Sequence, residues 1–125
     1  MIPYLLVILD EKGIIIDFQT TLEESRRGKE VIGQNWFDLF ISPQDRAKVL
    51  KVFNEILQGK DHNYRTYKND ILCQNGHHRL IDFYNKLLTK DGKRYTFSVG
   101  VEHLDAQDID LAQLAERLYA SHPFF

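Results

Sequence analysis

The stretch "ILCQNGHHRL", residues 71–80, holds the side chains of this chain that are best suited to chemistry. Cys73, His77 and His78 are close in sequence, and thiolate and imidazole groups serve both as zinc ligands and as partners in nucleophilic catalysis. If the stretch forms two strands joined by a turn, the two histidines point to opposite faces. Only Cys73 and His77 then remain as ligands, whereas a zinc site needs three or four. The pattern therefore favours a turn at the Asn-Gly pair, with solvated histidines, over a metal site.

Other catalytic arrangements find less support. No serine, cysteine or carboxylate pair has a partner at a recognisable spacing, and we expect Ser98 and Asp82 to lie on opposite strand faces. The chain also lacks a glycine-rich phosphate loop. A small hydrolase or isomerase would need a reactive pair of this kind, so we expect no enzymatic activity from this domain.

Composition limits the partners. The chain has 125 residues with a formal net charge of −2, which indicates one domain and gives no basic field for nucleic acid. Its single cysteine excludes an internal disulfide and fits a reducing compartment. The apolar run at residues 2–9 is too short to span a bilayer, so we expect a buried strand, no direct membrane contact and a cytoplasmic location.

The elements that must position any site follow from periodicity. Two short β-branched runs, 4–9 and 14–18, flank a turn containing Gly13, and 67–73, 79–88 and 94–102 alternate with a period of two. Between these groups, short helical pieces are expected in 20–41. A longer helix begins after Ser42, with Pro43 at its first position, and stops at Gly59. A last helix is expected over 107–121. The sequence thus predicts an α+β fold: a five-stranded antiparallel sheet with one covered face, helices inserted between strands 2 and 3, and a C-terminal helix.

The loops "QNG" and "KDG" set the predicted register of the last three strands. Each reads as a three-residue loop closed by a glycine bulge. This places Tyr67 opposite Phe83 in the first hairpin, and Asn85 opposite Phe97 in the second. One face then collects the apolar side chains of these strands: Ile71, Ile81, Phe83, Leu87, Phe97, Val99 and Val101.

In this order of elements, several stretches resemble the PAS sensory domain, especially the kind that precedes bacterial diguanylate cyclase (GGDEF) modules. They are "VIGQNWFDLF", "SPQDR" and "NDILCQNGHHRLIDFYN". The resemblance implies a PAS-like sensor domain over residues 1–104. The tail "LAERLYASHPFF" is similar to a linker helix that enters a GGDEF domain, so 105–125 is expected to be a signalling helix leading to an output domain.

The resemblance also implies a ligand cavity, because in PAS domains this strand face lines one. Asn85 is the polar residue of interest, since a buried amide needs hydrogen-bond partners from the protein or from a ligand. Equally, its side chain could bond to helix backbone, and the aromatic residues could simply form the core. The candidate pocket residues are Phe37, Phe40, Phe53, Ile71, Phe83, Asn85, Phe97 and Val99.

Known PAS cofactors can be compared with the chain. The "NCRFL" helix motif of photoreceptors that bind flavin covalently is absent, which argues against covalent flavin. The helix "DRAKVLKVFNEIL" contains no histidine, so a haem would depend on His62 alone, which argues against haem. A non-covalent flavin or a small metabolite stays open.

The expected function is that of a non-catalytic sensor. Leu111, Leu114 and Leu118 form one apolar stripe on the C-terminal helix. We expect a ligand to shift a population between two states and reorient this helix, paired with its copy in a homodimer, and so to control cyclic-di-GMP synthesis by a GGDEF output domain. The alternative is a PAS fold with a filled core and no ligand, which acts only as a dimerisation or interaction module.

Overall fold

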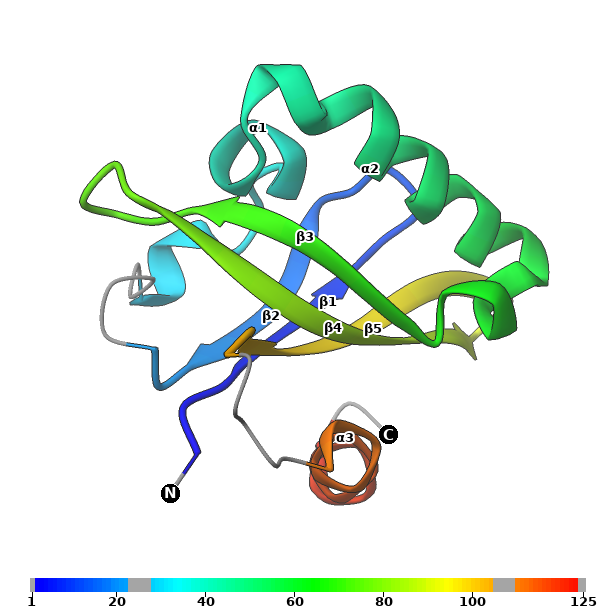
Figure 1. Ribbon diagram of the computed structural model, residues 1–125. Coiled ribbons are helices and arrows are strands. Elements are labelled where there is room, and N and C mark those ends of the chain that lie inside the picture. Colours follow the sequence, from blue (N-terminus) through cyan, green and yellow to red (C-terminus); the bar gives the residue numbers. More distant parts are fainter. Residues whose placement is uncertain (1, 23–27, 105–109, 124–125) are drawn as a thin grey trace.

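The computed structural model describes residues 2–22, 28–104 and 110–123. The five strands form one sheet in the order β2-β1-β5-β4-β3, with antiparallel pairing between neighbours. The sheet separates two helical layers: α1 and α2 lie on one side and α3 lies on the other (Figure 1). The predicted fold class is therefore confirmed.

The elements are β1 (Leu5–Leu9), β2 (Ile15–Thr20), the 3-10 helix η2 (Gly28–Val31), α1 (Trp36–Phe40), α2 (Pro43–Glu55), the π-helical turn η3 (Ile56–Lys60), the 3-10 helix η4 (Asp61–Tyr64), β3 (Thr66–Leu72), β4 (His78–Lys90), β5 (Lys93–Glu102) and α3 (Leu111–Ser121).

The turn between β1 and β2 shows why the chain reverses where the sequence predicts. Gly13 adopts a φ of 81°, which costs little for a residue without a Cβ. The Asp10 carboxylate accepts hydrogen bonds from the backbone N–H groups of Lys12 and Ile14, both at 2.9 Å. A side chain that bonds to the backbone two residues on stabilises such turns.

The first predicted hairpin register is confirmed. Tyr67 pairs with Phe83, Asn69 with Ile81 and Ile71 with Arg79. The backbone N–H of Cys73 donates to the carbonyl of His77 at 2.8 Å, and Gly76 has a φ of 86°.

The second predicted register is wrong by one residue. Lys90 pairs with Lys93, so the turn has two residues, Asp91 and Gly92, with φ values of 54° and 77°. Two consecutive positive φ values define a type I′ turn, for which Asp-Gly is a preferred sequence because its twist matches that of the strands. In consequence Phe83 pairs with Gly100 rather than with Val99.

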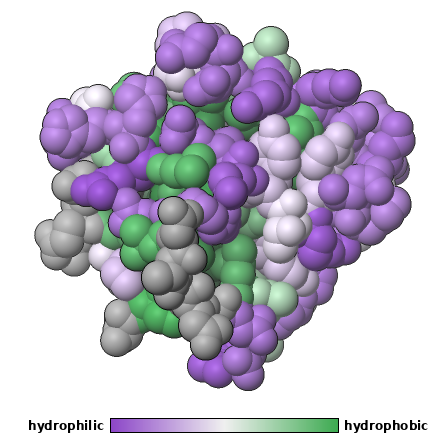
Figure 2. Space-filling view, in the orientation of Figure 1, coloured by the Kyte–Doolittle hydropathy of each residue, from purple (hydrophilic) through white to green (hydrophobic). Residues whose placement is uncertain are grey.

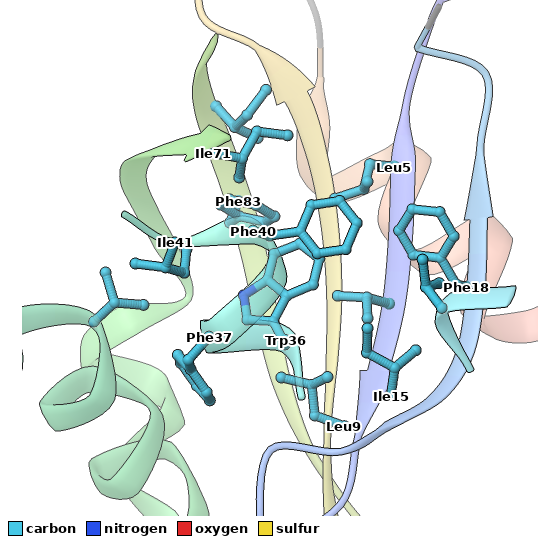
Figure 3. Packing of buried hydrophobic residues seen from close by; sticks show 14 of the residues in the cluster. Leu5, Leu9, Ile15, Phe18, Trp36, Phe37, Phe40, Ile41, Ile71 and Phe83 are labelled. Atoms are coloured by element: carbon cyan, nitrogen blue, oxygen red, sulfur yellow. The ribbon is translucent and has the colours of Figure 1, made fainter. Parts of the chain in front are cut away.

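This shift moves side chains from one face of the sheet to the other. Phe97 and Val99 pack in a cluster with Leu6, Ile8 and Tyr84 on the α3 side, not with Phe83. Val101 shares their face because side chains alternate along a strand. The predicted single covered face is therefore also wrong, since both faces are covered by apolar residues. The cluster on the α1 and α2 side, which includes Trp36, is shown in Figure 3.

The last helix, α3, packs on its own sheet. Its N-cap residue Asp110 accepts a hydrogen bond from the backbone N–H of Gln113 at 3.0 Å. The stripe of Leu111, Leu114 and Leu118 packs against the cluster around Phe97. The predicted start at Gln107 lies outside the described residues.

The face seen in Figure 2 is largely hydrophilic, and hydrophobic side chains show only in small areas between polar ones. Within the three described ranges, no helix has both the length and the apolar character needed to cross a bilayer.

Candidate ligand cavity

A cavity of about 50 Å³ lies between the sheet and the layer formed by α1, α2 and η3. Its walls are mainly apolar, and strands β1, β3, β4 and β5 together with α1, α2 and η3 contribute aromatic, aliphatic or uncharged polar side chains. The described lining residues are Val7, Leu9, Trp36, Phe37, Val49, Val52, Phe53, Ile56, Tyr67, Asn69, Phe83, Asn85, Thr96 and Ser98.

Local capping and packing place the aromatic wall. Asn35 caps α1, accepting a hydrogen bond from the backbone N–H of Phe37 at 2.9 Å. The Arg46 side chain from α2 donates to the carbonyl of Phe37 at 3.0 Å and so ties the two helices together. The rings of Phe37 and Phe53 then meet at 64°, with centroids 5.1 Å apart. This tilted geometry is favourable for two aromatic rings.

Behind this wall, a second aromatic group forms the core. Trp36 stacks on Phe40 with ring centroids 4.3 Å apart, and it meets Phe83 edge-on with centroids 6.4 Å apart. All three residues are labelled in Figure 3. Phe83 can lie flat on the sheet because its partner on β5 is Gly100. A Cβ at Gly100 would be 2.9 Å from Cε1 of Phe83, closer than packed carbon atoms approach.

The predicted pocket residues divide into three groups. Phe37, Phe53, Phe83 and Asn85 line the cavity. Phe40 and Ile71 belong to the adjoining core cluster but not to the lining. Phe97 and Val99 point to the opposite face, because the register of the second hairpin differs by one residue from the prediction.

Asn85 is held by protein groups. Its amide Nδ2 donates to the carbonyl of Tyr64 at 2.9 Å, and its Oδ1 accepts from the hydroxyl of Ser98 at 2.6 Å. Tyr64 is in the 3-10 helix η4, so the alternative of an amide bonded to helix backbone describes the observed contact. Asn85 therefore forms a fixed polar point in the wall, with one amide proton still available.

Thr96 is one of the polar lining residues that the sequence analysis missed, together with Asn69 and Ser98. Its exposed fraction is 2%, and within the described ranges its hydroxyl has no hydrogen-bond partner. The three-residue loop predicted at "KDG" placed Thr96 on the far face. The signal that could have found it is the Asp-Gly pair, which favours a two-residue turn.

No protein-family model matches the chain, and no curated protein sequence matches it. Solved structures do. The PAS domain of the RpfR quorum-sensing receptor from Cronobacter turicensis, in complex with BDSF, is 28% identical with a TM-score of 0.61. The match covers 81% of this chain and 94% of that one. The same domain in complex with C12:0 has a TM-score of 0.64 at the same identity and coverage.

The chain has the fold of a PAS domain. The PAS-B domain of Drosophila melanogaster Cycle, with bound ethylene glycol, has the same fold at 10% identity, with a TM-score of 0.62 over 79% of this chain and 99% of that one.

On the other face of the sheet, polar contacts hold α3 in place. The Tyr84 hydroxyl donates to Oε1 of Glu116 at 2.5 Å, and Lys86 Nζ lies 3.5 Å from Oε2 of the same carboxylate. Lys86 Nζ also lies 4.1 Å from the ring centroid of Tyr119. At the end of the helix, His122 Nε2 is 2.5 Å from Oδ2 of Asp17 on β2.

These contacts change two ionisation equilibria. The hydrogen bond from Tyr84 lowers the pKa of Glu116 below its ordinary value of 4.5, against the opposing effect of burial, and Lys86 lowers it further. Burial, followed by the bond to Glu116, raises the pKa of Tyr84 above 10.0. The pair is therefore most stable with a neutral tyrosine and a charged carboxylate.

The side chains of the cysteine and histidine stretch differ in their exposure to solvent. Cys73 is buried at 1% exposure, whereas His77 and His78 are exposed. Across the described parts of the chain, no three His, Cys, Asp or Glu side chains are grouped so that they could hold a metal ion.

Proposed function

We propose that this PAS domain is a non-catalytic sensory domain of a signalling protein, which binds a small, largely apolar molecule in the cavity and passes the binding event to α3. The observation that carries this proposal is the apolar cavity between sheet and α2, with uncharged polar groups fixed in its wall. Ligand sites in proteins typically combine apolar walls with a few placed polar groups. The BDSF and C12:0 complexes of the similar Cronobacter domain support a ligand with a hydrocarbon part.

The proposed path of the signal is strand β4. Phe83 and Asn85 face the cavity, whereas the intervening Tyr84 and the following Lys86 contact Glu116 on α3. A ligand that displaces Phe83 moves the backbone that carries Tyr84. Such a ligand shifts the population between docked and released α3 only if it binds the two states with different affinity.

For the whole signalling protein, the proposal extends the sequence resemblance. Residues 1–104 form the sensor, and 105–125 lead into a GGDEF output domain in a cytoplasmic homodimer that synthesises cyclic-di-GMP. Pairing through Leu111, Leu114 and Leu118 would require α3 to leave the sheet, because these side chains pack on it. The test is cyclic-di-GMP production from GTP by the full-length protein with and without ligand. Unchanged synthesis at saturating ligand would contradict this part.

A second candidate function is a dimerisation or interaction module without a ligand. The small volume of the cavity, about 50 Å³, favours it, because aromatic side chains occupy most of the space between sheet and helices. Under this hypothesis the purified protein carries no small molecule, and its stability does not respond to any.

Native mass spectrometry and thermal unfolding separate the two functions. For a sensor, we expect a co-purified mass or a stabilisation of about 2.7 kcal/mol at a ligand concentration one hundred times the dissociation constant. Val52→Phe fills the cavity from α2 and should abolish the response. Leu50→Phe, on the exposed side of the same helix, is the matched control and should keep it. A response that survives Val52→Phe unchanged would place the ligand elsewhere.

A further inference from the structure

Thr96 gives the cavity a chemical preference. Building on the proposed function, we infer that the cavity selects an uncharged molecule whose neutral polar group bonds to the Thr96 hydroxyl, and that it rejects the carboxylate form of the same carbon chain. The preference concerns the head group of the ligand, and the apolar wall binds its hydrocarbon part.

The first observation is the state of Thr96 itself. Thr96 has an exposed fraction of 2%, lines the cavity, and has no hydrogen-bond partner for its hydroxyl within the described part of the chain. Buried hydroxyl groups are nearly always paired, so an unpaired one calls for an explanation. A ligand that bonds to it supplies the missing partner.

The second observation is the lack of charge. None of the described residues that line the cavity is acidic or basic. A carboxylate placed there would lose its hydration without gaining a counter-charge, which strongly disfavours the ionised form. A neutral hydroxyl or amide does not meet this penalty.

The third observation is that protein groups already use part of the donor capacity of the wall. One amide proton each of Asn85 and Asn69 and the hydroxyls of Thr96 and Tyr67 are left for a carboxylate, which only accepts hydrogen bonds. The single hydroxyl proton of Ser98 is used in its bond to Asn85 Oδ1. One Asn85 amide proton is used by the carbonyl of Tyr64. Asn69 donates to the carbonyl of Asp70 at 3.0 Å. An alcohol, in contrast, accepts from Thr96 or donates to it, because the threonine hydroxyl does both.

The position of Thr96 also defines which end of the cavity holds the head group. Thr96 pairs with Leu9 on β1 and with Leu87 on β4, whereas Asn69 pairs with Ile81, six residues away along β4. Thr96 and Asn69 therefore mark opposite ends of the cavity. A polar group bonded to Thr96 leaves the rest of the ligand to run toward Phe83, along the apolar wall.

The experiment compares propan-1-ol with propanoic acid, because a cavity of about 50 Å³ suits a short chain, and follows the fluorescence of Trp36. Trp36 is the only tryptophan of the chain and lines the cavity, so its emission reports on this site alone. At pH 8 we expect the alcohol to bind at least about tenfold more tightly than the acid, a difference of about 1.4 kcal/mol. Below pH 8, acid binding should strengthen about tenfold per pH unit as its neutral fraction grows.

Variants test the role of Thr96. Thr96→Val should weaken alcohol binding about tenfold without lowering stability, because the lost hydroxyl has no protein partner. Thr96→Ser keeps a hydroxyl and should keep the preference for the alcohol. Thr89→Val makes the same change at an exposed position of β4 and should leave binding unchanged.

The outcomes separate this inference from the proposed function. If the acid binds as tightly as the alcohol at pH 8, or if Thr96→Val binds the alcohol like the parent protein, the inference is overturned while the sensor proposal stands. If neither compound changes Trp36 emission and native mass spectrometry finds no bound molecule, both are overturned.

Discussion

Phe83 and Tyr84 are neighbours on β4 that serve opposite layers of the domain. The ring of Phe83 lines the cavity, and the hydroxyl of Tyr84 donates to Glu116 of α3 at 2.5 Å. Because successive side chains of a strand point to opposite faces, the cavity and the C-terminal helix lie on the two sides of the peptide unit that joins Phe83 and Tyr84.

Removal of the Tyr84–Glu116 bond should loosen α3. We expect Tyr84→Phe and Glu116→Gln each to lower the free energy of unfolding by about 1 kcal/mol, because each removes one hydrogen bond at a partly buried site. Urea denaturation of both single variants and the double variant measures their coupling. Strictly additive losses would show that the two side chains do not interact.

The same pair predicts a pH dependence. Glu116 has a lowered pKa in the folded state, so its contribution is present above its unfolded pKa and is lost as the pH falls through the folded one. Tyr84 has a raised pKa, so its contribution is lost as the pH rises beyond 10.0. The stability difference between the parent and Glu116→Gln should therefore shrink on acidification below about pH 4.5. A difference that stays constant to pH 3 would contradict the assignment.

The end of α3 depends on His122 and Asp17, which lie 2.5 Å apart. Replacing His122 with alanine should increase hydrogen exchange at the amides of α3 by roughly tenfold, because a bond worth about 1.5 kcal/mol is lost there. Amides of β3, on the far edge of the sheet, serve as the internal reference. Equal exchange of α3 in both proteins would mean that the helix is held without this contact.

Gly100 is expected to tolerate no side chain. In Gly100→Ala, the new Cβ would lie 2.5 Å from Cγ2 of Ile81 and 2.9 Å from Phe83, and both neighbours are packed in the core. Overpacking of this kind lowers the free energy of unfolding by about 1–3 kcal/mol. The double variant Gly100→Ala/Phe83→Leu should recover part of the loss, since the smaller side chain makes room. No recovery would assign the loss to the closer contact with Ile81 instead.

The turn residue Asp91 offers a matched pair of substitutions. Its φ of 54° suits asparagine but is strained for a β-branched residue, so Asp91→Val should cost about 1–2 kcal/mol and Asp91→Asn little. Thermal unfolding of the two variants gives the comparison. If both behave alike, the turn does not keep its two-residue form in solution.

This turn also explains how far the sequence determined the fold. Periodicity located every strand, and the loop at Gly76 set the first register correctly. At Asp91 and Gly92, the sequence is compatible with both a three-residue and a two-residue loop. The pattern of apolar residues in β5 does not show which of the two registers is formed. Because both faces of the sheet are covered, Phe97 and Val99 are buried in either register.

The sequence predicted those residues of the candidate site whose position does not depend on the register of β5. Phe37, Phe53, Phe83 and Asn85 follow from the fold, because none depends on the register of β5. Thr96 and Ser98 do depend on it and were missed. The partner of α3 could not be predicted either, because an apolar stripe shows that a helix packs but not against what.

The docking of α3 on its own sheet has a consequence at the level of the cell. In the proposed homodimer, the leucines that cover the sheet would also contact the second chain, so the internal contact would compete with the external one. The internal contact does not depend on how many copies are present, whereas the external one strengthens with abundance. The balance between the two states is then a function of expression level as well as of signal.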